Sequence, residues 1–229
     1  HRDVVEELVP GALRRTSLLW EIDAQVSDFE NLCQAIFVLG ELTARGLDAV
    51  ASFGERLSAR LVAAALRERR VPAEAVDATN LIVTDDHYGG ASPLMDETRE
   101  RTRTVLLPLL NEGVTPVVTG YIGATAKGTT TTLGRGGSDY SAAILGSCLD
   151  SPEIWIWTDV DGVLTADPRM VPDARTLPEI SYGEAAELSY FGAKVLYPKT
   201  ILPAAERSIP LRILNTFNPD HPGTLVLAE

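Results

Sequence analysis

Residues Thr129–Thr158, TTTTLGRGGSDYSAAILGSCLDSPEIWIWT, hold two β-rich runs with a glycine-rich loop and a helical pattern between them. The β-rich runs cover 129–133 and 154–158, and the helical pattern covers 138–149. A strand, a helix and a second strand in this order are typical of a βαβ unit, in which the helix carries the chain back so that the two strands pair in parallel. This stretch therefore predicts an α/β fold with a mainly parallel sheet.

The same alternation continues on both sides of this stretch. Further β-rich runs lie at 73–76, 81–84, 115–122, 210–214 and 224–227, and helical patterns lie at 95–111, 182–191 and 201–206. Since parallel sheets are covered by helices on both faces, we expect a three-layer αβα sandwich. Trp155 and Trp157 alternate with isoleucines and leave their strand without a polar face, which predicts a central position in the sheet.

The N-terminal part of the chain has helical periodicity instead. Apolar residues recur at three- and four-residue spacing over 18–42 and again over 47–70. The second segment carries five arginines that we expect on a solvated helix face: Arg56, Arg60, Arg67, Arg69 and Arg70. No repeat or linker-like stretch divides the sequence. We therefore predict one domain over 1–229, with a helical part at 1–70 and a sheet-rich part at 71–229.

Composition excludes several classes of protein. Of the 229 residues 45% are hydrophobic and 23% are charged, which is globular and neither disordered nor collagen-like. The chain has 32 acidic and 20 basic residues, a net charge of −12, which disfavours binding to nucleic acid or to an anionic membrane. Its longest uncharged run, 113–126, is too short to span a bilayer, and the charged first residues do not form a signal peptide. Cys33 and Cys148 are expected as buried, reduced thiols of a cytoplasmic protein.

The glycine-rich loop Thr132–Asp139 is a candidate anion site. Its three glycines let the backbone adopt positive φ and approach a ligand, and Ser138 is expected to cap the helix that begins near Asp139. The free N–H groups at a helix start attract anions, and Arg135 adds a guanidinium that can bind a carboxylate or a phosphate at two points. The loop matches neither the P-loop nor the dinucleotide fingerprint. A capped turn between a strand and a helix is the alternative interpretation.

Two further places could bind a nucleotide. Thr158 and Asp159 end the Trp-containing strand, at the edge of a parallel sheet where ligands bind, although a turn-rich loop without a ligand is the alternative. Lys194 follows Phe191-Gly-Ala and could contact a phosphate, or it could only stabilise a helix C-terminus.

Glu55 is a candidate for binding an ammonium group. It follows Gly54, and a glycine inside a helical pattern suggests either a helix boundary or a close approach of another group. An exposed carboxylate on a helix surface is the alternative.

Together these motifs resemble the aspartate kinase family, which has the amino acid kinase fold. The resemblance is carried in order by TTTLGRGGSDY at 130–140, WTDVDGV at 157–163, ADPR at 166–169, FGAK at 191–194, NTFNP at 215–219 and PGT at 222–224. It covers the chain from the helices before Ser52 to Leu227.

The resemblance implies ATP-dependent phosphorylation of the side-chain carboxylate of L-aspartate, giving 4-phospho-L-aspartate in the first step of lysine, threonine and methionine biosynthesis. It implies that Glu55 binds the α-ammonium group, that Tyr121 lines the pocket and that Asp139 organises the phosphoryl-transfer centre. It assigns the α-carboxylate to four neighbouring residues: Arg135, Gly136, Gly137 and Ser138.

On the nucleotide side the resemblance implies six residues: Thr158, Asp159, Leu164, Asp167, Arg169 and Lys194. Lys194 is also a catalytic candidate, because a lysine near the transferring phosphate would neutralise charge. ATP and Mg²⁺ are the implied cofactors, and the metal is expected on the ATP phosphates because the sequence contains no protein-only metal site.

The chain departs from the family in two ways. No segment matches the family's opening Lys-Phe-Gly-Gly-Thr-Ser strand and loop, and no regulatory ACT domains follow Leu227. We therefore expect a kinase domain that is incomplete at its N-terminus, with little turnover by these residues alone and with homo-oligomers formed by the full-length protein. The alternatives are another carboxylate or carbamate kinase of this fold, and an inactive ligand-binding or oligomerisation module.

Overall fold

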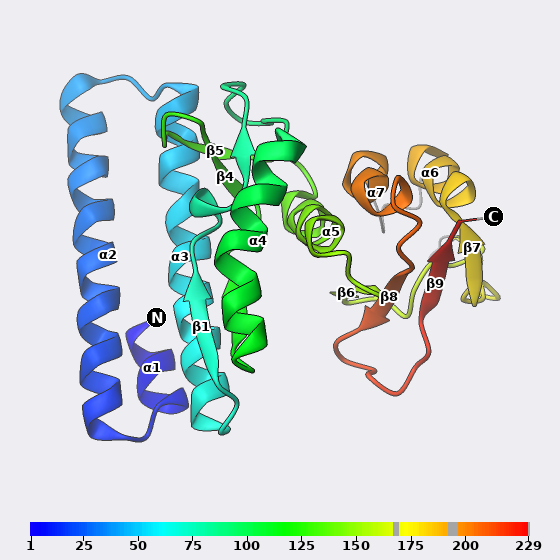
Figure 1. Ribbon diagram of the computed structural model, residues 1–229, viewed down its shortest axis with the longest axis horizontal. Coiled ribbons are helices and arrows are strands. Elements are labelled where there is room, and N and C mark those ends of the chain that lie inside the picture. The colour runs from blue at the N-terminus through cyan, green and yellow to red at the C-terminus, as the bar shows by residue number, and fades with distance from the viewer. Residues whose placement is uncertain (167–169, 192–196, 229) are drawn as a thin grey trace. The chain divides into compact units, whose positions relative to one another are not determined.

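The computed structural model describes residues 1–166, 170–191 and 197–228 (Figure 1). The chain divides into two compact units, His1–Gly134 (unit 1) and Arg135–Glu229 (unit 2), and the division falls inside the glycine-rich loop. Both units mix helices and strands, and four of the six strand pairings among the described residues are parallel. The predicted α/β class with a mainly parallel arrangement is confirmed, while the single-domain prediction stays a prediction.

Unit 1 combines long helices with two small sheets. Its helices are α1 (Arg2–Leu8), α2 (Ala12–Leu39), α3 (Ala44–Glu68), the 3₁₀ helix η1 (Ala78–Asn80) and α4 (Met95–Asn111). Its strands are β1 (Ala73–Val76), β2 (Val83–Thr84), β3 (Thr115–Val118), β4 (Ile122–Thr125) and β5 (Thr130–Thr132). β1 pairs with β3 in parallel, and a second sheet has the order β2-β4-β5, in which β5 is antiparallel to β4.

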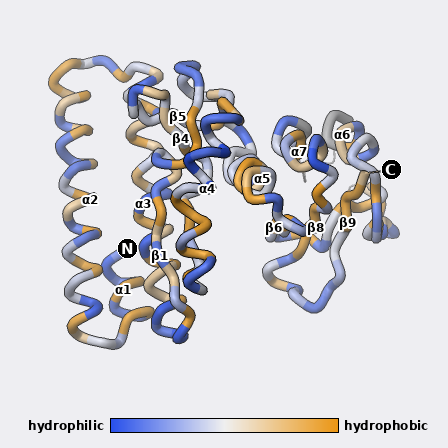
Figure 2. The backbone as a smooth tube through the Cα atoms, viewed as in Figure 1, coloured by the Kyte–Doolittle hydropathy of each residue, from blue (hydrophilic) through white to orange (hydrophobic). Residues whose placement is uncertain are grey.

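The ends of the long helices follow from local chemistry. α2 stops at Gly40, whose φ of 68° suits a residue without a Cβ. α3 starts after Thr43, whose side chain accepts a hydrogen bond from the Gly46 N–H at 3.0 Å. α1, α2 and α3 share an apolar core built from Val5, Val9, Leu18, Ile22, Leu57 and Ala64. Hydrophobic residues occur along the whole length of α2 (Figure 2), and none of the described helices is long and apolar enough to cross a membrane.

Unit 2 is a four-stranded sheet with three helices. Its elements are α5 (Gly137–Leu149), β6 (Ile154–Thr158), β7 (Glu179–Ser181), α6 (Tyr182–Phe191), α7 (Pro198–Ala205), β8 (Leu211–Asn215) and β9 (Thr224–Leu227). The strand order is β6-β8-β9-β7, with only β8 and β9 antiparallel among the described pairings. The core is built from branched apolar side chains of the strands packed against the three helices, including Ile154, Ile156, Ile201, Leu211, Ile213 and Val226.

The prediction that the Trp-containing strand is central is wrong. β6 lies at one end of its sheet within the described residues, and Trp155 and Trp157 are 55% and 46% exposed. Ile154 and Ile156, on the opposite face, are both only 6% exposed. The strand therefore has one buried and one exposed face. The expectation failed because large apolar side chains also occur on exposed faces, where composition alone cannot reveal their environment.

Candidate functional site

In unit 1, α3 brings Glu55 next to the loop between β3 and β4. The Glu55 carboxylate is half-buried and accepts a backbone hydrogen bond from Gly120. Burial raises the pKa of Glu55 above its ordinary value, and the hydrogen bond from Gly120 lowers it in part. α3 continues through Gly54 without a boundary, and beyond the adjacent residues and the backbone of α3 itself no described atom lies within 4 Å of the position a Cβ would take there. A half-buried carboxylate without a described cationic partner is suited to bind an ammonium group.

Tyr121 follows directly in this loop and has an unusual backbone conformation. Its φ is 67°, in the left-handed region, which costs a residue with a Cβ roughly 1–2 kcal/mol. Its carbonyl accepts a hydrogen bond from the Leu133 N–H at 2.8 Å, just before the glycines of the glycine-rich loop. Such strain persists only where surrounding contacts impose it, and it is enriched at ligand sites. Unit 1 thus brings Glu55, Tyr121 and the start of the glycine-rich loop together.

The glycines of this loop are required by its packing. Gly134 has a φ of 77°, and a Cβ there would lie 3.2 Å from the Gly89 carbonyl oxygen. Gly136 has a φ of 70°, and a Cβ there would lie 2.9 Å from a methyl carbon of Thr200. Larger residues at either position would therefore displace the loop.

The predicted helix cap is wrong by two residues. The residue that caps α5 is Gly136, and no side chain caps the helix, which begins at Gly137. Ser138 therefore lies inside the first turn. The expectation failed because a glycine can enter the left-handed region and turn the chain earlier than a serine cap would. The N–H groups of this first turn still point out of the helix end, where an anion is stabilised.

Arg135 lies between these glycines and is exposed. Its guanidinium carbon is 4.9 Å from the ring centre of Tyr197, a cation–π contact that orients the side chain. No carboxylate among the described residues pairs with it, so its planar set of donors can bind a carboxylate of a ligand at two points.

Asp139 follows in the first turn of α5 and is half-buried. Burial raises the pKa of its carboxyl group, and no cation in the described part of the chain offsets this effect. A cation brought by a ligand would stabilise the ionised form. In kinase sites Mg²⁺ is held by substrate phosphates and one or two carboxylates, so Asp139 has the chemistry of a residue that could hold it.

The described part of the predicted nucleotide side lies at the end of β6. The Thr158 hydroxyl donates a hydrogen bond to an Asp159 carboxylate oxygen at 3.1 Å, and Asp159 is exposed. Leu164 is half-buried and bridges to Thr176. Three predicted residues lie outside the described residues: Asp167, Arg169 and Lys194.

The loop after β6 is held by residues to which the sequence interpretation gave no role. Asp161 accepts hydrogen bonds from the side-chain amides of Asn215 and Asn218 at 2.8 and 3.0 Å, and these bonds lower the pKa of Asp161. The Thr224 hydroxyl accepts a hydrogen bond from the Val163 N–H at 2.8 Å and donates one to the Leu177 carbonyl at 2.6 Å. Asn215 and Asn218 belong to the motif NTFNP and Thr224 to the motif PGT, so the sequence marked both segments. Only the contacts in the structure show that these residues support the loop after β6.

Two of the five arginines are not placed as predicted. The Arg60 side chain is only 27% exposed and donates a hydrogen bond to the Arg56 carbonyl at 2.8 Å. Arg56 was expected on the solvated face of its helix, yet its side chain is only 19% exposed and pairs with Asp77 at 2.6 Å. It also donates to the hydroxyl groups of Ser52 and Thr130, at 3.0 and 3.4 Å. The expectation failed because periodicity cannot tell a solvated face from one covered by a polar strand.

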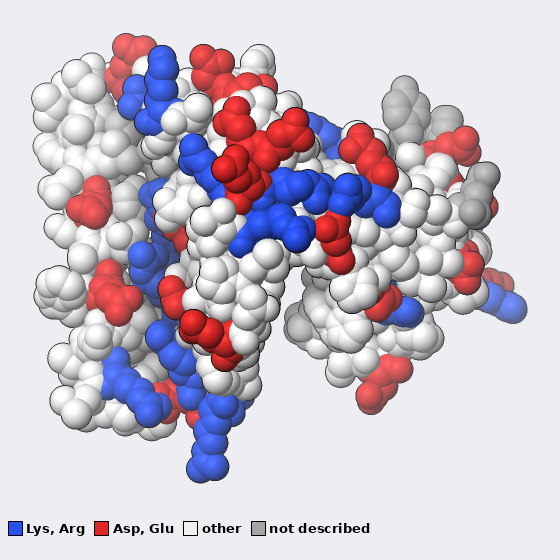
Figure 3. Space-filling view, in the orientation of Figure 1, with Lys and Arg blue, Asp and Glu red and all other residues white. Residues whose placement is uncertain are grey.

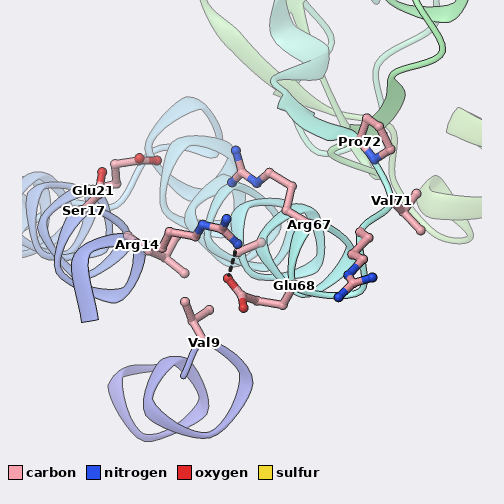
Figure 4. Close-up of a pocket in the computed structure, with 11 residues that line it drawn as sticks. Val9, Arg14, Ser17, Glu21, Arg67, Glu68, Val71 and Pro72 are labelled. Carbon is pink, nitrogen blue, oxygen red and sulfur yellow. Dashed lines mark hydrogen bonds and ion pairs between the residues drawn. The ribbon is translucent and has the colours of Figure 1, made fainter. Parts of the chain in front are cut away.

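A pocket of about 500 Å³ lies elsewhere in unit 1, lined by residues of α2 and α3, by Val9 directly after α1 and by the segment before β1. Figure 4 shows Arg14 and Glu68 paired inside it, at 3.0 Å. None of the predicted site residues lines this pocket. On the face drawn in Figure 3, acidic and basic side chains are interspersed over unit 1.

Comparison with known proteins gives a consistent result. The amino acid kinase family matches residues 8–215. Lysine-sensitive aspartokinase 3 of Escherichia coli (strain K12) is 44% identical over 204 residues, covering 87% of this chain and 45% of the relative. Chloroplastic aspartokinase 2 of Arabidopsis thaliana is 40% identical over 207 residues, covering 90% of this chain and 38% of the relative.

The fold comparison agrees. The crystal structure of E. coli aspartokinase III in complex with aspartate and ADP superimposes with a TM-score of 0.89 at 40% identity, covering 98% of this chain and 49% of that one. The chain thus spans about half the length, or less, of these relatives. With the matched family extending over nearly the whole sequence, this chain belongs to the amino acid kinase family.

Proposed function

We propose that the protein is an aspartate kinase, which transfers the γ-phosphoryl group of ATP to the side-chain carboxylate of L-aspartate. The observation that carries the proposal is the pair of complementary groups on the chain. Glu55 is a half-buried carboxylate without a described cationic partner, and Arg135 is a guanidinium without a described carboxylate partner. Free α-amino acids present the matching ammonium and carboxylate. The similarity to aspartokinases, one of them solved with aspartate and ADP, supports aspartate as the amino acid.

Each residue has a specific role in this proposal. Glu55 binds the α-ammonium group, and Tyr121 lines the pocket. Arg135 binds the α-carboxylate, together with the backbone N–H groups of Gly136, Gly137 and Ser138. The side-chain carboxylate of aspartate is then left free to react.

An oxygen of that carboxylate attacks the γ-phosphorus while the bond from this phosphorus to the β–γ bridging oxygen breaks. The products are ADP and 4-phospho-L-aspartate, and no covalent enzyme intermediate is required. The protein accelerates such a transfer by positioning the reactants and by neutralising charge. The proposed nucleotide contacts are Thr158, Asp159, Leu164, Asp167, Arg169 and Lys194, with Lys194 also placed near the transferring phosphate.

Asp139 organises the phosphoryl-transfer centre. A carboxylate cannot itself neutralise a phosphate, so it acts by orienting a cation. When bound, Mg²⁺ would neutralise charge on the ATP phosphates, and Asp139 is the described residue that would help to hold it.

The proposal extends to the role of the whole protein. Its product would supply lysine, threonine and methionine biosynthesis. The intact protein would also form homo-oligomers. The exposed apolar residues of α2, such as Trp20 and Phe37, support this part of the proposal. Analytical ultracentrifugation of the intact protein measures this directly.

The test is ADP release by the intact protein with aspartate, glutamate, acetate or carbamate as the acceptor. We expect release with aspartate alone, and trapping of the acyl phosphate with hydroxylamine should yield aspartyl hydroxamate. Release with another acid would favour a different kinase of this fold. Aspartate binding without ADP release would favour the inactive binding module.

Asp139→Asn tests the catalytic role of Asp139, because it removes the charge and keeps the shape of the side chain. We expect turnover to fall by about 100-fold or more, because charge stabilisation in the transition state is lost. The thermal midpoint without ligands should stay the same or rise, since a carboxylate with a pKa raised by burial is replaced by a neutral amide. A parallel loss of stability and turnover would assign Asp139 to the fold instead of the reaction.

A further inference from the structure

Asp48 is a buried carboxylate in α3 that takes no part in the proposed reaction. Its exposure is only 2%. It accepts hydrogen bonds from the Gly89 N–H at 3.1 and 3.0 Å, one to each oxygen. It also accepts one from the Thr132 N–H at 2.9 Å and one from the Thr132 hydroxyl at 2.8 Å. An ionised carboxylate has about four acceptor positions, so this one is fully used.

The two donor residues frame the start of the glycine-rich loop. Thr132 is the last residue of β5, two positions before Gly134. Gly89 packs against Gly134 so closely that a Cβ on Gly134 would lie 3.2 Å from the Gly89 carbonyl oxygen. Leu133, between Thr132 and Gly134, donates to the Tyr121 carbonyl. Asp48 therefore binds Thr132, which precedes the glycines of the loop, and also Gly89, which packs against the first of these glycines.

Packing alone does not account for a carboxylate at this position. Burying a charge is costly unless hydrogen bonds compensate it, and an apolar side chain would cover β5 without that cost. Unlike an apolar side chain, a carboxylate fixes the positions of the groups that it binds, because its two oxygens accept hydrogen bonds from three donors in defined directions. Glu55 lies about two turns further along the same helix, so α3 carries both the proposed ammonium-binding group and the group that holds the loop.

We propose that Asp48 is a positioning residue for the amino acid substrate, acting through Thr132 and Gly89 to set where the glycine-rich loop begins. The effect of Asp48 on substrate kinetics rests on the proposed aspartate kinase activity. The residue acts on the loop that carries Arg135, so its loss affects the amino acid and not the nucleotide.

Asp48→Asn in the intact protein tests this proposal. An asparagine keeps the shape but replaces one acceptor oxygen with an amino group that faces N–H donors. We expect the KM for aspartate to rise about tenfold or more, since small displacements of binding groups have large effects, while the KM for ATP changes less than about twofold. Amide hydrogen exchange should become faster at Gly89 and at 132–134. An unchanged KM for aspartate, or equal changes for both substrates, would overturn the proposal.

A pair of threonine variants gives a milder comparison that does not depend on Asp48→Asn folding. Thr132→Val removes only the hydroxyl bond to Asp48. Thr98→Val is the matched control, because Thr98 is also fully buried and, among the described residues, its hydroxyl bonds to the backbone of Val83 alone. We expect Thr132→Val to raise the KM for aspartate and Thr98→Val to leave it unchanged. Equal KM values in the two variants would contradict the positioning role.

Hydrogen exchange separates this proposal from the proposed function. If the wild-type protein does not phosphorylate aspartate, the function is wrong, yet faster exchange at Gly89 and Thr132 in Asp48→Asn would still support the positioning role. Unchanged exchange at these amides would overturn the role of Asp48 even in an active aspartate kinase.

Discussion

In unit 1 the segment before the glycine-rich loop is held by hydrogen bonds to one buried carboxylate, whereas in unit 2 the loop near Asp159 combines side-chain hydrogen bonds with glycines at very close contacts. Asp48 bonds to Thr132 and Gly89 in unit 1. In unit 2 a Cβ on Gly162 would lie 2.4 Å from the Thr224 hydroxyl oxygen, and a Cβ on Gly223 would lie 1.9 Å from the Ile213 carbonyl oxygen. The Asp48 contacts depend on the presence of a polar group, whereas the contacts at Gly162 and Gly223 depend on the absence of a side chain at these two positions.

This difference has consequences for mutation. A hydrogen-bonded carboxylate can be replaced by a similar group with graded loss of function. A glycine in a crowded left-handed turn has no conservative replacement, because every other residue adds a Cβ. We therefore expect conservative substitutions of Asp48 and Thr132 in unit 1 to act mainly on binding, and substitutions of Gly162 and Gly223 in unit 2 to act mainly on stability.

Gly223→Ala should have the largest effect. The added Cβ meets the Ile213 carbonyl and the φ of 69° is unfavourable for alanine, so we expect a loss of about 3 kcal/mol or more in the free energy of unfolding. Urea denaturation measures this loss. Gly54→Ala is the control in unit 1: nothing lies within 4 Å, and alanine in the interior of α3 should stabilise by up to about 1 kcal/mol. Similar stabilities for the two variants would remove the contrast between the units.

Arg135→Ala should have the next largest effect, on binding instead of stability. It removes a charge-assisted contact worth roughly 1.5–3 kcal/mol, so aspartate affinity should fall about 10- to 100-fold while ATP affinity changes little. Isothermal titration calorimetry with each ligand measures both. Arg207→Ala is a control in the same unit, because Arg207 forms an exposed ion pair with Asp150. Unchanged aspartate affinity in Arg135→Ala would exclude Arg135 from the site.

Glu55→Gln should produce the smallest effect, visible mainly in pH dependence. Burial raises the pKa of Glu55, so its folded form holds the proton more strongly than the unfolded form does. Stability from this group is therefore greatest below its ordinary pKa of 4.5 and falls as the pH rises towards the folded pKa. Glu55→Gln should remove this decline, and stability measured between pH 4 and pH 7 checks it.

The same titration has the opposite effect on substrate binding. Only the ionised carboxylate attracts an ammonium group, so aspartate binding should strengthen as the pH rises through the pKa of Glu55. In Glu55→Gln the affinity should be lower and should lose this dependence. An identical pH profile in the variant would place the ammonium group elsewhere.

Several elements were predicted from sequence with the correct bounds. The helices 95–111 and 182–191 and the strands 73–76, 154–158 and 224–227 are confirmed. These segments have clear periodicity or short β-rich runs between turn residues, and local preferences are sufficient to define them. The aspartate kinase resemblance likewise rested on motifs with fixed spacing, and family membership confirms it at the level of the amino acid kinase family.

The errors share a physical cause. The cap at Ser138, the central position of Trp155 and the solvated Arg56 were each inferred from one residue and its neighbours in sequence. In each case the backbone path or a partner distant in sequence decides the outcome: Gly136 adopts the left-handed conformation and α5 starts after it, β8 pairs with β6 on one side, and Asp77 pairs with Arg56.

The sequence by itself determined the α/β class, the family and the residues proposed to bind aspartate, because periodicity and motif spacing are properties of the chain alone. Only the tertiary structure decided which polar residues are buried and what they bind. Asp48 lies within an apolar helical pattern and carries no motif, and its role depends on Gly89 and Thr132, which are 41 and 84 residues away. Contacts at such separations form only when the chain folds, since hydrogen bonds act over about 3 Å in space regardless of distance along the sequence.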